Sequence, residues 1–205
     1  MSRMMGLARL AVLAGALALA GCKTIENSLS QNDIAGMKLT DISVSFAPDA
    51  TIQWDDGIRA YATSKSITDD QIATATNTPE GKAYVRNLLA QRIKAGVDKT
   101  MAGHLNGSRP VRLNIVVHSF TISPAIQRIV VGGGHGMLAD ANLVDARTGA
   151  SIVAYPKMNV FLVVGQGVLG TAVQAAIDHA SEQSTVDKIA SRYGDSYRDW
   201  LLRKS

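Results

Sequence analysis

The stretch Asp145-Ala146-Arg147-Thr148-Gly149 lies between two apolar runs and predicts a tight reversal of the chain. Aspartate at the entry of such a turn accepts hydrogen bonds from the backbone that follows, and glycine at its end tolerates a positive φ angle. We expect one strand from Met137 to Ala146 and another that passes through Phe161 to Val164. Strands joined in this way are antiparallel, so the stretch favours a sheet built from hairpins.

Three further elements are expected before this hairpin. Alternating apolar and polar residues predict strands over about 39–47 and 110–122. Between them, Thr78-Pro79-Glu80 has the composition of a helix start, and the helix is expected to run over about 79–106. Lys94 on this helix is expected to be solvated and of little consequence for stability. The apolar face that the helix should bury consists of Val85, Leu88, Leu89, Ile93, Val97, Met101 and Leu105.

The segment from Pro48 to Asn77 loses clear periodicity and is interpreted as a long loop. Thr68-Asp69-Asp70-Gln71 within it can cap one short helix. Trp54, Asp55 and Asp56 bring an aromatic ring and two carboxylates together in this loop. They are the candidate interaction residues, expected to contribute to an exposed patch.

Gly165, Gly167 and Gly170 spell G-x-G-x-x-G, the glycine pattern of a dinucleotide-binding turn. Such a site needs a second strand after the helix, yet the pattern that follows predicts two helices: an apolar face from Val168 to Ala180, and a run to Leu201 opened by a capping box at Ser184–Asp187. We therefore expect a tight turn with close packing and no cofactor. A nucleotide-dependent enzyme remains the remote alternative.

Together the elements predict an α+β fold. Its four-stranded sheet is mixed or antiparallel, two main helices lie on one face, and the element order is βαβββα. The four histidines lack metal-ligand spacing, and the paired aspartates lack the regular spacing of a calcium loop. No catalytic, cofactor-binding or metal-binding residue is predicted, so we expect a protein that is not an enzyme.

The N-terminal residues have the pattern of a secretory signal. Arg3 and Arg9 precede the apolar run Leu10–Ala20, which is too short for a membrane span of about 20 residues. Leu19-Ala20-Gly21-Cys22 resembles the lipobox of bacterial lipoproteins. The resemblance implies cleavage between Gly21 and Cys22 and acylation of Cys22, which would anchor the chain to a membrane through its acyl chains. Cys22 is the only cysteine, so an intramolecular disulfide is impossible.

These features divide the chain into three parts. Residues 1–21 are expected to be a signal peptide, 22–37 an acylated N-terminus with a polar tether, and 38–205 a single α+β domain. Ile25 and Leu29 are four residues apart, so the alternative for part of the tether is a turn of helix against the domain. Removal of residues 1–21 also removes Arg3 and Arg9, so 19 of the 21 lysines and arginines remain. With 17 aspartates and glutamates, the formal charge is then +2. This near-balance, without a basic stripe, argues against nucleic acid as a partner.

The lipobox and the order of strands and helices resemble the auxiliary lipoproteins of LPS assembly and ABC transport, and several uncharacterised lipoprotein families. The resemblance implies a periplasm-facing outer-membrane lipoprotein that acts as a non-catalytic accessory or scaffold among envelope proteins. Lys23 supports the outer membrane, because aspartate at that position is the usual inner-membrane retention signal in enteric bacteria. The alternative is a carrier of lipid or another apolar ligand. A carrier predicts a cavity between sheet and helices, and a scaffold predicts a filled core.

Overall fold

The computed structural model describes residues 25–123, 134–163 and 171–203, and for Val163 and residues 171–184 it describes the backbone alone. One four-stranded sheet runs through these residues in the order β1-β2-β3-β4. β1 and β2 are parallel, whereas β2, β3 and β4 are antiparallel neighbours. The strands are β1 (Met37–Gln53), β2 (Arg109–Ile122), β3 (Gly134–Asp145) and β4 (Ser151–Val163).

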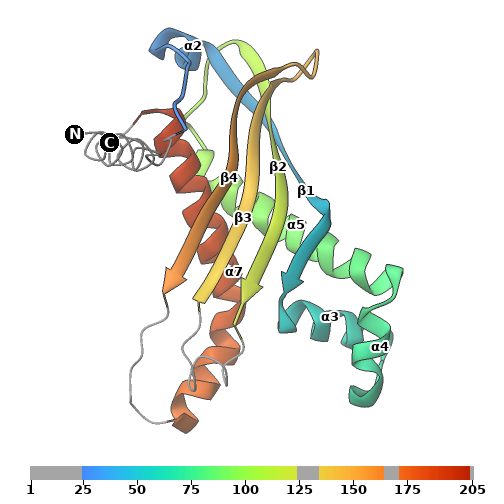
Figure 1. The fold of residues 1–205 in the computed structure, drawn as a ribbon. Helices are drawn as coiled ribbons and strands as arrows, with labels where there is room; N and C mark the ends of the chain where they lie inside the picture. Colours follow the sequence, from blue (N-terminus) through green and yellow to red (C-terminus); the bar gives the residue numbers. More distant parts are fainter. Residues whose placement is uncertain (1–24, 124–133, 164–170, 204–205) are drawn as a thin grey trace, which may run out of the picture.

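Two long helices, α5 (Pro79–Met101) and α7 (Thr171–Leu201), pack side by side on one face of the sheet (Figure 1). The α+β fold with a mixed four-stranded sheet and two main helices on one face is therefore confirmed. One detail differs from the expectation of hairpins alone. The β1-to-β2 connection is a crossover, because parallel neighbours need a long connection that returns to the starting end of the sheet.

The β3–β4 hairpin is built as its sequence predicts. The Asp145 carboxylate accepts hydrogen bonds from the backbone N–H groups of Arg147 and Thr148 at 3.1 and 3.2 Å, and Gly149 has a φ of 74°. Arg109 Nε also donates to Asp145, at 3.2 Å. The N–H groups of Thr148 and Arg147 hold the pKa of Asp145 below its ordinary value of 3.8.

Helix α5 begins where predicted and ends earlier. The Thr78 hydroxyl accepts a hydrogen bond from the Gly81 N–H, as expected of an N-cap. The helix stops at Met101, because the chain turns at Gly103 with a φ of 76°. Leu105 is still buried, but it lies beyond the helix. Leu88 is half-buried, and the other six predicted core positions are buried.

The interpretation of residues 48–77 as a loop is wrong. β1 continues to Gln53, and three helices follow: α3 (Asp55–Lys65), the short 3-10 helix η2 (Asp69–Gln71) and α4 (Ile72–Thr76). Thr68 precedes η2 at the expected position, but its side chain makes no capping hydrogen bond. The apolar contacts of α3 come from Ile58, Tyr61 and Ala62, whose spacing of three and four is helical but too short to stand out in the sequence.

The C-terminal region forms one helix and not two. α7 continues through Ser184–Asp187, so the predicted capping box does not open a helix. Thr185 and Val186 are buried in mid-helix, and the apolar face continues beyond them to Leu201. Burial of the apolar face from Val186 to Leu201 outweighs the local preference of the polar residues for a helix start. Gly165, Gly167 and Gly170 lie outside the described residues.

The polar N-terminal stretch is not an extended tether over residues 25–36. It packs against the C-terminal end of α7, where Asn27 Nδ2 donates to the Leu201 carbonyl at 2.7 Å and Trp200 Nε1 donates to the Ile25 carbonyl at 2.7 Å. The short helix α2 (Gln31–Gly36) follows, capped by reciprocal hydrogen bonds between Ser30 and Asp33. Residues 25–36 are thus part of the folded domain.

The core between the sheet and the two long helices is filled. Side chains from β2, β3, α5 and α7 have almost no solvent exposure there, and those at 0% include Leu89, Ile93, Leu113, Ile115, Ala141, Ile189 and Tyr193. The side chains that the structure describes in this core are thus shielded from solvent. No described helix is long and apolar enough to cross a membrane.

Candidate binding groove

A large bulge in β1 opens a groove at the edge of the sheet. Phe46 pairs with Val117 of β2 and Thr51 pairs with Ser119, so residues 47–50 of β1 leave the regular ladder. Pro48 lies in this bulge and has no N–H to donate to a neighbouring strand. Pro48, Asp49 and Ala50 of the bulge form one wall of the groove.

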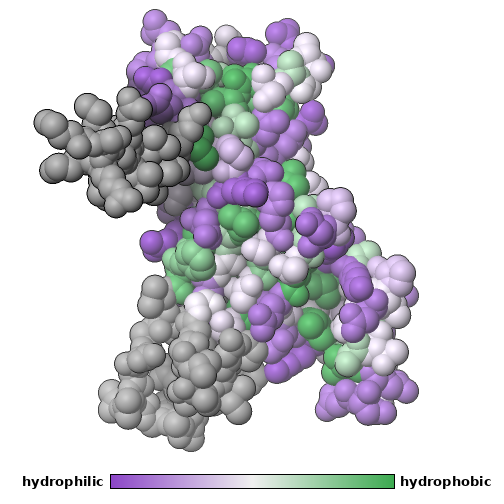
Figure 2. Space-filling model, viewed as in Figure 1, coloured by the Kyte–Doolittle hydropathy of each residue, from purple (hydrophilic) through white to green (hydrophobic). Residues whose placement is uncertain are grey.

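The groove consists of two adjoining hollows along β1 and α5, and we refer to it as the β1–α5 groove. The larger hollow, about 780 Å³, lies between the bulge, α3, α4 and the first turns of α5. Its apolar lining includes Ile52, Ile58 and Ile72, and Figure 2 shows hydrophobic residues near α3 and α4. The smaller hollow, about 650 Å³, continues along α5 beside Phe46. Both hollows share Asn77, Lys82 and Arg86.

Two cations stand at the junction of the hollows. Lys82 is exposed and Arg86 is half-buried, one turn apart on α5. The Arg86 guanidinium lies over the Phe46 ring at 5.8 Å from its centroid, a cation–π contact. Within the described residues, neither Lys82 nor Arg86 forms an ion pair. Asp49 and Asp69 line the larger hollow but not the smaller one.

The candidate interaction residues do not form an exposed patch around an aromatic ring. Trp54 is only 2% exposed and packs against Gly57 at the junction of β1 and α3. The expectation of an exposed Trp54 is therefore wrong, because β1 continues directly into a helix that buries the ring. Asp55 and Asp56 are half-buried in the first turn of α3, where carboxylates are favoured by the helix dipole.

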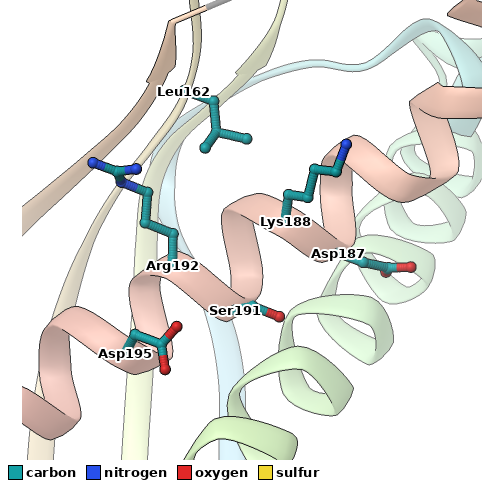
Figure 3. Close-up of a pocket in the computed structure, with 6 residues that line it drawn as sticks. All are labelled: Leu162, Asp187, Lys188, Ser191, Arg192 and Asp195. Atoms are coloured by element: carbon teal, nitrogen blue, oxygen red, sulfur yellow. The ribbon is translucent and has the colours of Figure 1, made fainter.

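A third hollow, about 490 Å³, lies between α7 and the end of β4. In Figure 3, Arg192 extends towards Leu162 on the strand, whereas Asp187 points towards α5. Asp187 faces Arg92 of α5 at 3.6 Å. Lys188 and Arg192 are one turn apart, as Lys82 and Arg86 are in the groove. Among the described residues that line this hollow, Leu162 is the one large apolar residue, and the other five are polar or charged.

The face of the sheet away from the long helices is mostly polar. Ser43 donates to Asn114 at 2.8 Å across β1 and β2, and Ser151 donates to Asn142 at 2.7 Å across β4 and β3. Figure 2 shows hydrophilic and hydrophobic residues interspersed over these strands. Phe161 is the exception, with 59% of its surface exposed. This face is a solvated surface or an area for a polar partner.

Asp140 organises the middle of this polar face. Its carboxylate lies 2.8 Å from His118 Nε2 on β2 and accepts the Lys157 N–H of β4 at 2.7 Å. Partial burial raises the pKa of Asp140, but the hydrogen bonds from Lys157 and His118 outweigh it and leave the pKa below its ordinary value of 3.8. Lys157 has a φ of 51°, and Asp140 stabilises this bulge in β4.

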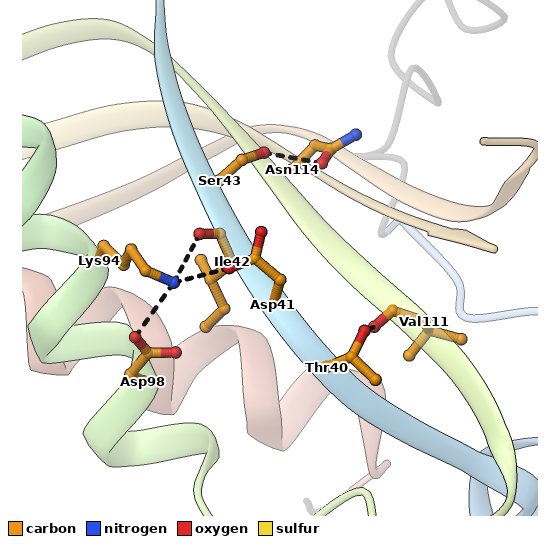
Figure 4. Close-up of polar contacts among 8 residues, drawn as sticks. All are labelled: Thr40, Asp41, Ile42, Ser43, Lys94, Asp98, Val111 and Asn114. Carbon is orange, nitrogen blue, oxygen red and sulfur yellow. Dashed lines mark hydrogen bonds and ion pairs between the residues drawn. The ribbon is translucent and has the colours of Figure 1, made fainter. Parts of the chain in front are cut away.

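Lys94 is not the free surface lysine that its position on α5 suggested. Its Nζ donates to the Ile42 carbonyl at 2.8 Å and to Asp41 at 2.9 Å, and it lies 3.4 Å from Asp98 (Figure 4). The hydrogen bond from Lys94 holds the pKa of Asp41 below its ordinary value of 3.8. Lys94 therefore links α5 to β1 and occupies an edge carbonyl of the sheet.

The site residues predicted at the N-terminus, Gly21 and Cys22, lie outside the described residues. Among the residues that are described, no group of three histidine, cysteine or acidic side chains is arranged to hold a metal ion. The β1–α5 groove is the feature that sequence reasoning missed. Its signal was Ala47-Pro48-Asp49 within a strand pattern, because proline inside a strand is typical of an edge or a bulge.

No protein-family model matches the chain, and neither does any curated protein. Solved structures are similar to it at low sequence identity. A candidate lipoprotein from Caulobacter crescentus is 20% identical, with 57% of this chain and 85% of that chain covered and a TM-score of 0.34. The PelC dodecamer from Paraburkholderia phytofirmans is 12% identical, with 85% of this chain and 94% of that chain covered and a TM-score of 0.37. A lipoprotein from Neisseria meningitidis is 17% identical, with 68% of this chain and 98% of that chain covered and a TM-score of 0.24. Likeness this distant assigns neither family nor function.

Proposed function

We propose that the protein is a lipid-anchored lipoprotein of the cell envelope that faces the periplasm and acts as a non-catalytic accessory or scaffold. Leu19-Ala20-Gly21-Cys22 supports the anchor, because the cysteine stands where a lipobox requires it. Lys23 supports the outer membrane over the inner one. Once acylated, Cys22 would hold the chain far more firmly than one reversible acyl chain does.

The observation that carries the proposal is the folded position of residues 25–36. Ile25 and Asn27 are hydrogen-bonded to the last turn of α7. Cys22 is three residues before Ile25, so an extended chain places it at most about 11 Å away. An acylated Cys22 therefore brings the end of α7 to the membrane surface, and the domain has a limited choice of orientations.

The β1–α5 groove would then face away from the membrane. β1 starts at Met37 beside α2 and has 17 residues, so it spans roughly 50 Å before it ends at Gln53. Figure 1 shows α2 at one end of the molecule and α3 and α4 at the other. The filled core favours a scaffold over a carrier that holds its ligand between sheet and helices. An accessory protein of this shape offers its polar sheet face to other envelope proteins.

The anchor is tested by replacing Cys22. Mass spectrometry of the wild-type protein should find acyl chains on a mature N-terminus at Cys22, and the protein should fractionate with outer membranes. Cys22→Ala should be uncleaved or released from the outer membrane, while Ser2→Ala, in the same signal, should behave as wild type. Recovery of an unacylated soluble wild-type protein that begins after residue 22 would refute the proposal.

The orientation is tested with the two tryptophans, which lie at opposite ends of the domain. Acylated protein in vesicles that contain brominated phospholipids should show quenching of Trp200 in a Trp54→Phe variant. Trp54, observed in a Trp200→Phe variant, should keep its fluorescence. Equal quenching of both residues would mean that the domain has no preferred orientation. Crosslinking in intact cells, with the bound proteins identified, then tests the scaffold role.

A further inference from the structure

We propose that the β1–α5 groove binds a single-chain amphiphile with an anionic head, such as a fatty acid. This inference goes beyond a scaffold role and does not depend on the lipid anchor. The groove has two properties that such a ligand needs: an apolar hollow of suitable size and, at one end of it, two cations that form no ion pair with a described residue. Ligand pockets have volumes of about 300–1,000 Å³, and the larger hollow, at about 780 Å³, falls in this range.

The larger hollow supplies the surface for an apolar tail. Ile52 and Ile58 are half-buried and pack on the core with one side, while both also line the hollow. Ile72 of α4 is half-buried and lines the hollow, yet within the described residues it does not pack against the core. An acyl chain that covered these isoleucines would remove their apolar surface from water, which is favourable in proportion to the area buried.

Charge places the head group at the junction with the smaller hollow. Lys82 and Arg86 line both hollows, and they are the charged residues that line the smaller one. Asp49 and Asp69 line the larger hollow, where they would repel an anion. A carboxylate is therefore favoured beside Lys82 and Arg86, with its chain directed towards Ile72. Charge-assisted hydrogen bonds from these two side chains would hold it there.

An extended peptide fits the groove less well than an acyl chain. A strand that adds to a sheet edge needs a row of free backbone N–H and C=O groups. Pro48 lacks an N–H, residues 47–50 form the bulge, and Lys94 already occupies the Ile42 carbonyl. An acyl chain makes no backbone hydrogen bonds, so the bulge does not hinder it.

The hollow in Figure 3 provides an internal comparison. Lys188 and Arg192 have the same one-turn spacing on α7 as Lys82 and Arg86 have on α5. Leu162 is the one large apolar residue among the described residues that line it, so the described surface beside these cations is mainly polar. If cations alone were sufficient, this hollow would bind the same ligand. We expect binding in the β1–α5 groove and not at this hollow.

Trp54 allows the proposal to be tested by fluorescence, because it lies two residues after Ile52 and one helical turn before Ile58. The experiment uses the full mature chain, residues 22–205, with Cys22→Ser so that neither acyl chains nor detergent compete. Dibromostearate is titrated below its micelle concentration into a Trp200→Phe variant. Saturable quenching of Trp54 is expected. In a Trp54→Phe variant, Trp200 at the other end should not be quenched.

Variants separate the two halves of the site. Lys82→Gln with Arg86→Gln should weaken dibromostearate binding about tenfold or more, and should remove the preference over the uncharged dibromostearate methyl ester. Ile72→Asp should abolish saturable quenching. Lys188→Gln with Arg192→Gln is the matched control and should bind as the parent does. Circular dichroism checks that each variant is folded.

Four results would overturn the proposal. The first is the absence of saturable quenching of Trp54, and the second is equal affinity for the acid and its methyl ester. The third is loss of binding in the Lys188 and Arg192 control but not in the Lys82 and Arg86 variant. Capture of a partner polypeptide by a photocrosslinker at position 72, undiminished by stearate, would assign the groove to a protein and also overturn it.

Discussion

Gly96 of α5 lies directly against Ala190 of α7, so that a β-carbon on Gly96 would meet the Ala190 β-carbon at 2.5 Å. The two helices also approach closely at Gly194, where a β-carbon would overlap the Thr100 side chain. These glycines are needed for packing and not for an unusual φ angle. The absence of side chains at these two points allows both helices to lie on the same face of the sheet.

Gly96→Ala should therefore destabilise the protein, although alanine is favoured over glycine within helices by about 1 kcal/mol. The added methyl group meets a rigid β-carbon, and overpacking of this kind costs about 1–3 kcal/mol. Urea unfolding should show a lower midpoint. Gly36→Ala is the control, because nothing lies within 4 Å of its new β-carbon. A more stable Gly96→Ala variant would show that the helices separate easily.

Leu89→Ala should cost about 2–5 kcal/mol of unfolding free energy, because Leu89 is fully buried between α5 and the sheet. Leu88 is its neighbour and is half-buried, so Leu88→Ala should cost clearly less. Chemical unfolding of both variants provides the comparison. Similar costs at the two positions would mean that the buried face of α5 is misassigned.

Lys94→Met should lower stability more than Lys99→Met does. Methionine keeps most of the apolar stem but loses the hydrogen bonds from Lys94 to Asp41 and to the Ile42 carbonyl. The ion pair is largely exposed, so its own contribution is at most about 1 kcal/mol. Lys99 is exposed and serves as the reference on the same helix. Equal midpoints in urea for the two variants would restore the original expectation of a solvated Lys94.

Stability should fall in acid because several aspartates have lowered pKa values in the folded state, among them Asp41, Asp140 and Asp145. A carboxyl group whose folded pKa lies below its unfolded value stabilises the fold above the unfolded pKa, and this contribution disappears as pH falls through the folded pKa. The decline should therefore begin near pH 4 and continue below it. Replacing all three by asparagine should make the thermal midpoint, measured by calorimetry, depend less on pH between pH 5 and pH 3. An unchanged slope would contradict the assignment.

Nucleotides should not stabilise the protein if Gly165, Gly167 and Gly170 serve only a turn. A cofactor at one hundred times its dissociation constant would add about 2.7 kcal/mol, so millimolar NAD, NADP or FAD would reveal even micromolar binding. We expect no thermal shift with any of them. A shift that Gly167→Ala abolishes would restore the enzyme alternative.

The sequence by itself determined the elements whose signals are local and long. The cap at Thr78, the apolar repeat of α5, the alternation in β2 and the turn at Asp145–Gly149 each contain the residues that stabilise them. These signals were sufficient for the fold class. The lipobox at Leu19–Cys22 is likewise a local pattern, independent of the folded domain.

Tertiary structure decided the features that depend on residues far apart in the chain. Trp54 is buried because α3 packs against its ring. Helix α7 continues through Ser184–Asp187 because its apolar face is buried. Asn27 is held by hydrogen bonds to the carbonyls of Trp200 and Leu201, 173 and 174 residues away. The groove exists because β1 keeps its pairing with β2 on both sides of a bulge. The free energy of burial is a sum over many contacts. It therefore outweighs the local preferences of a few tenths of a kcal/mol on which a prediction from sequence patterns rests.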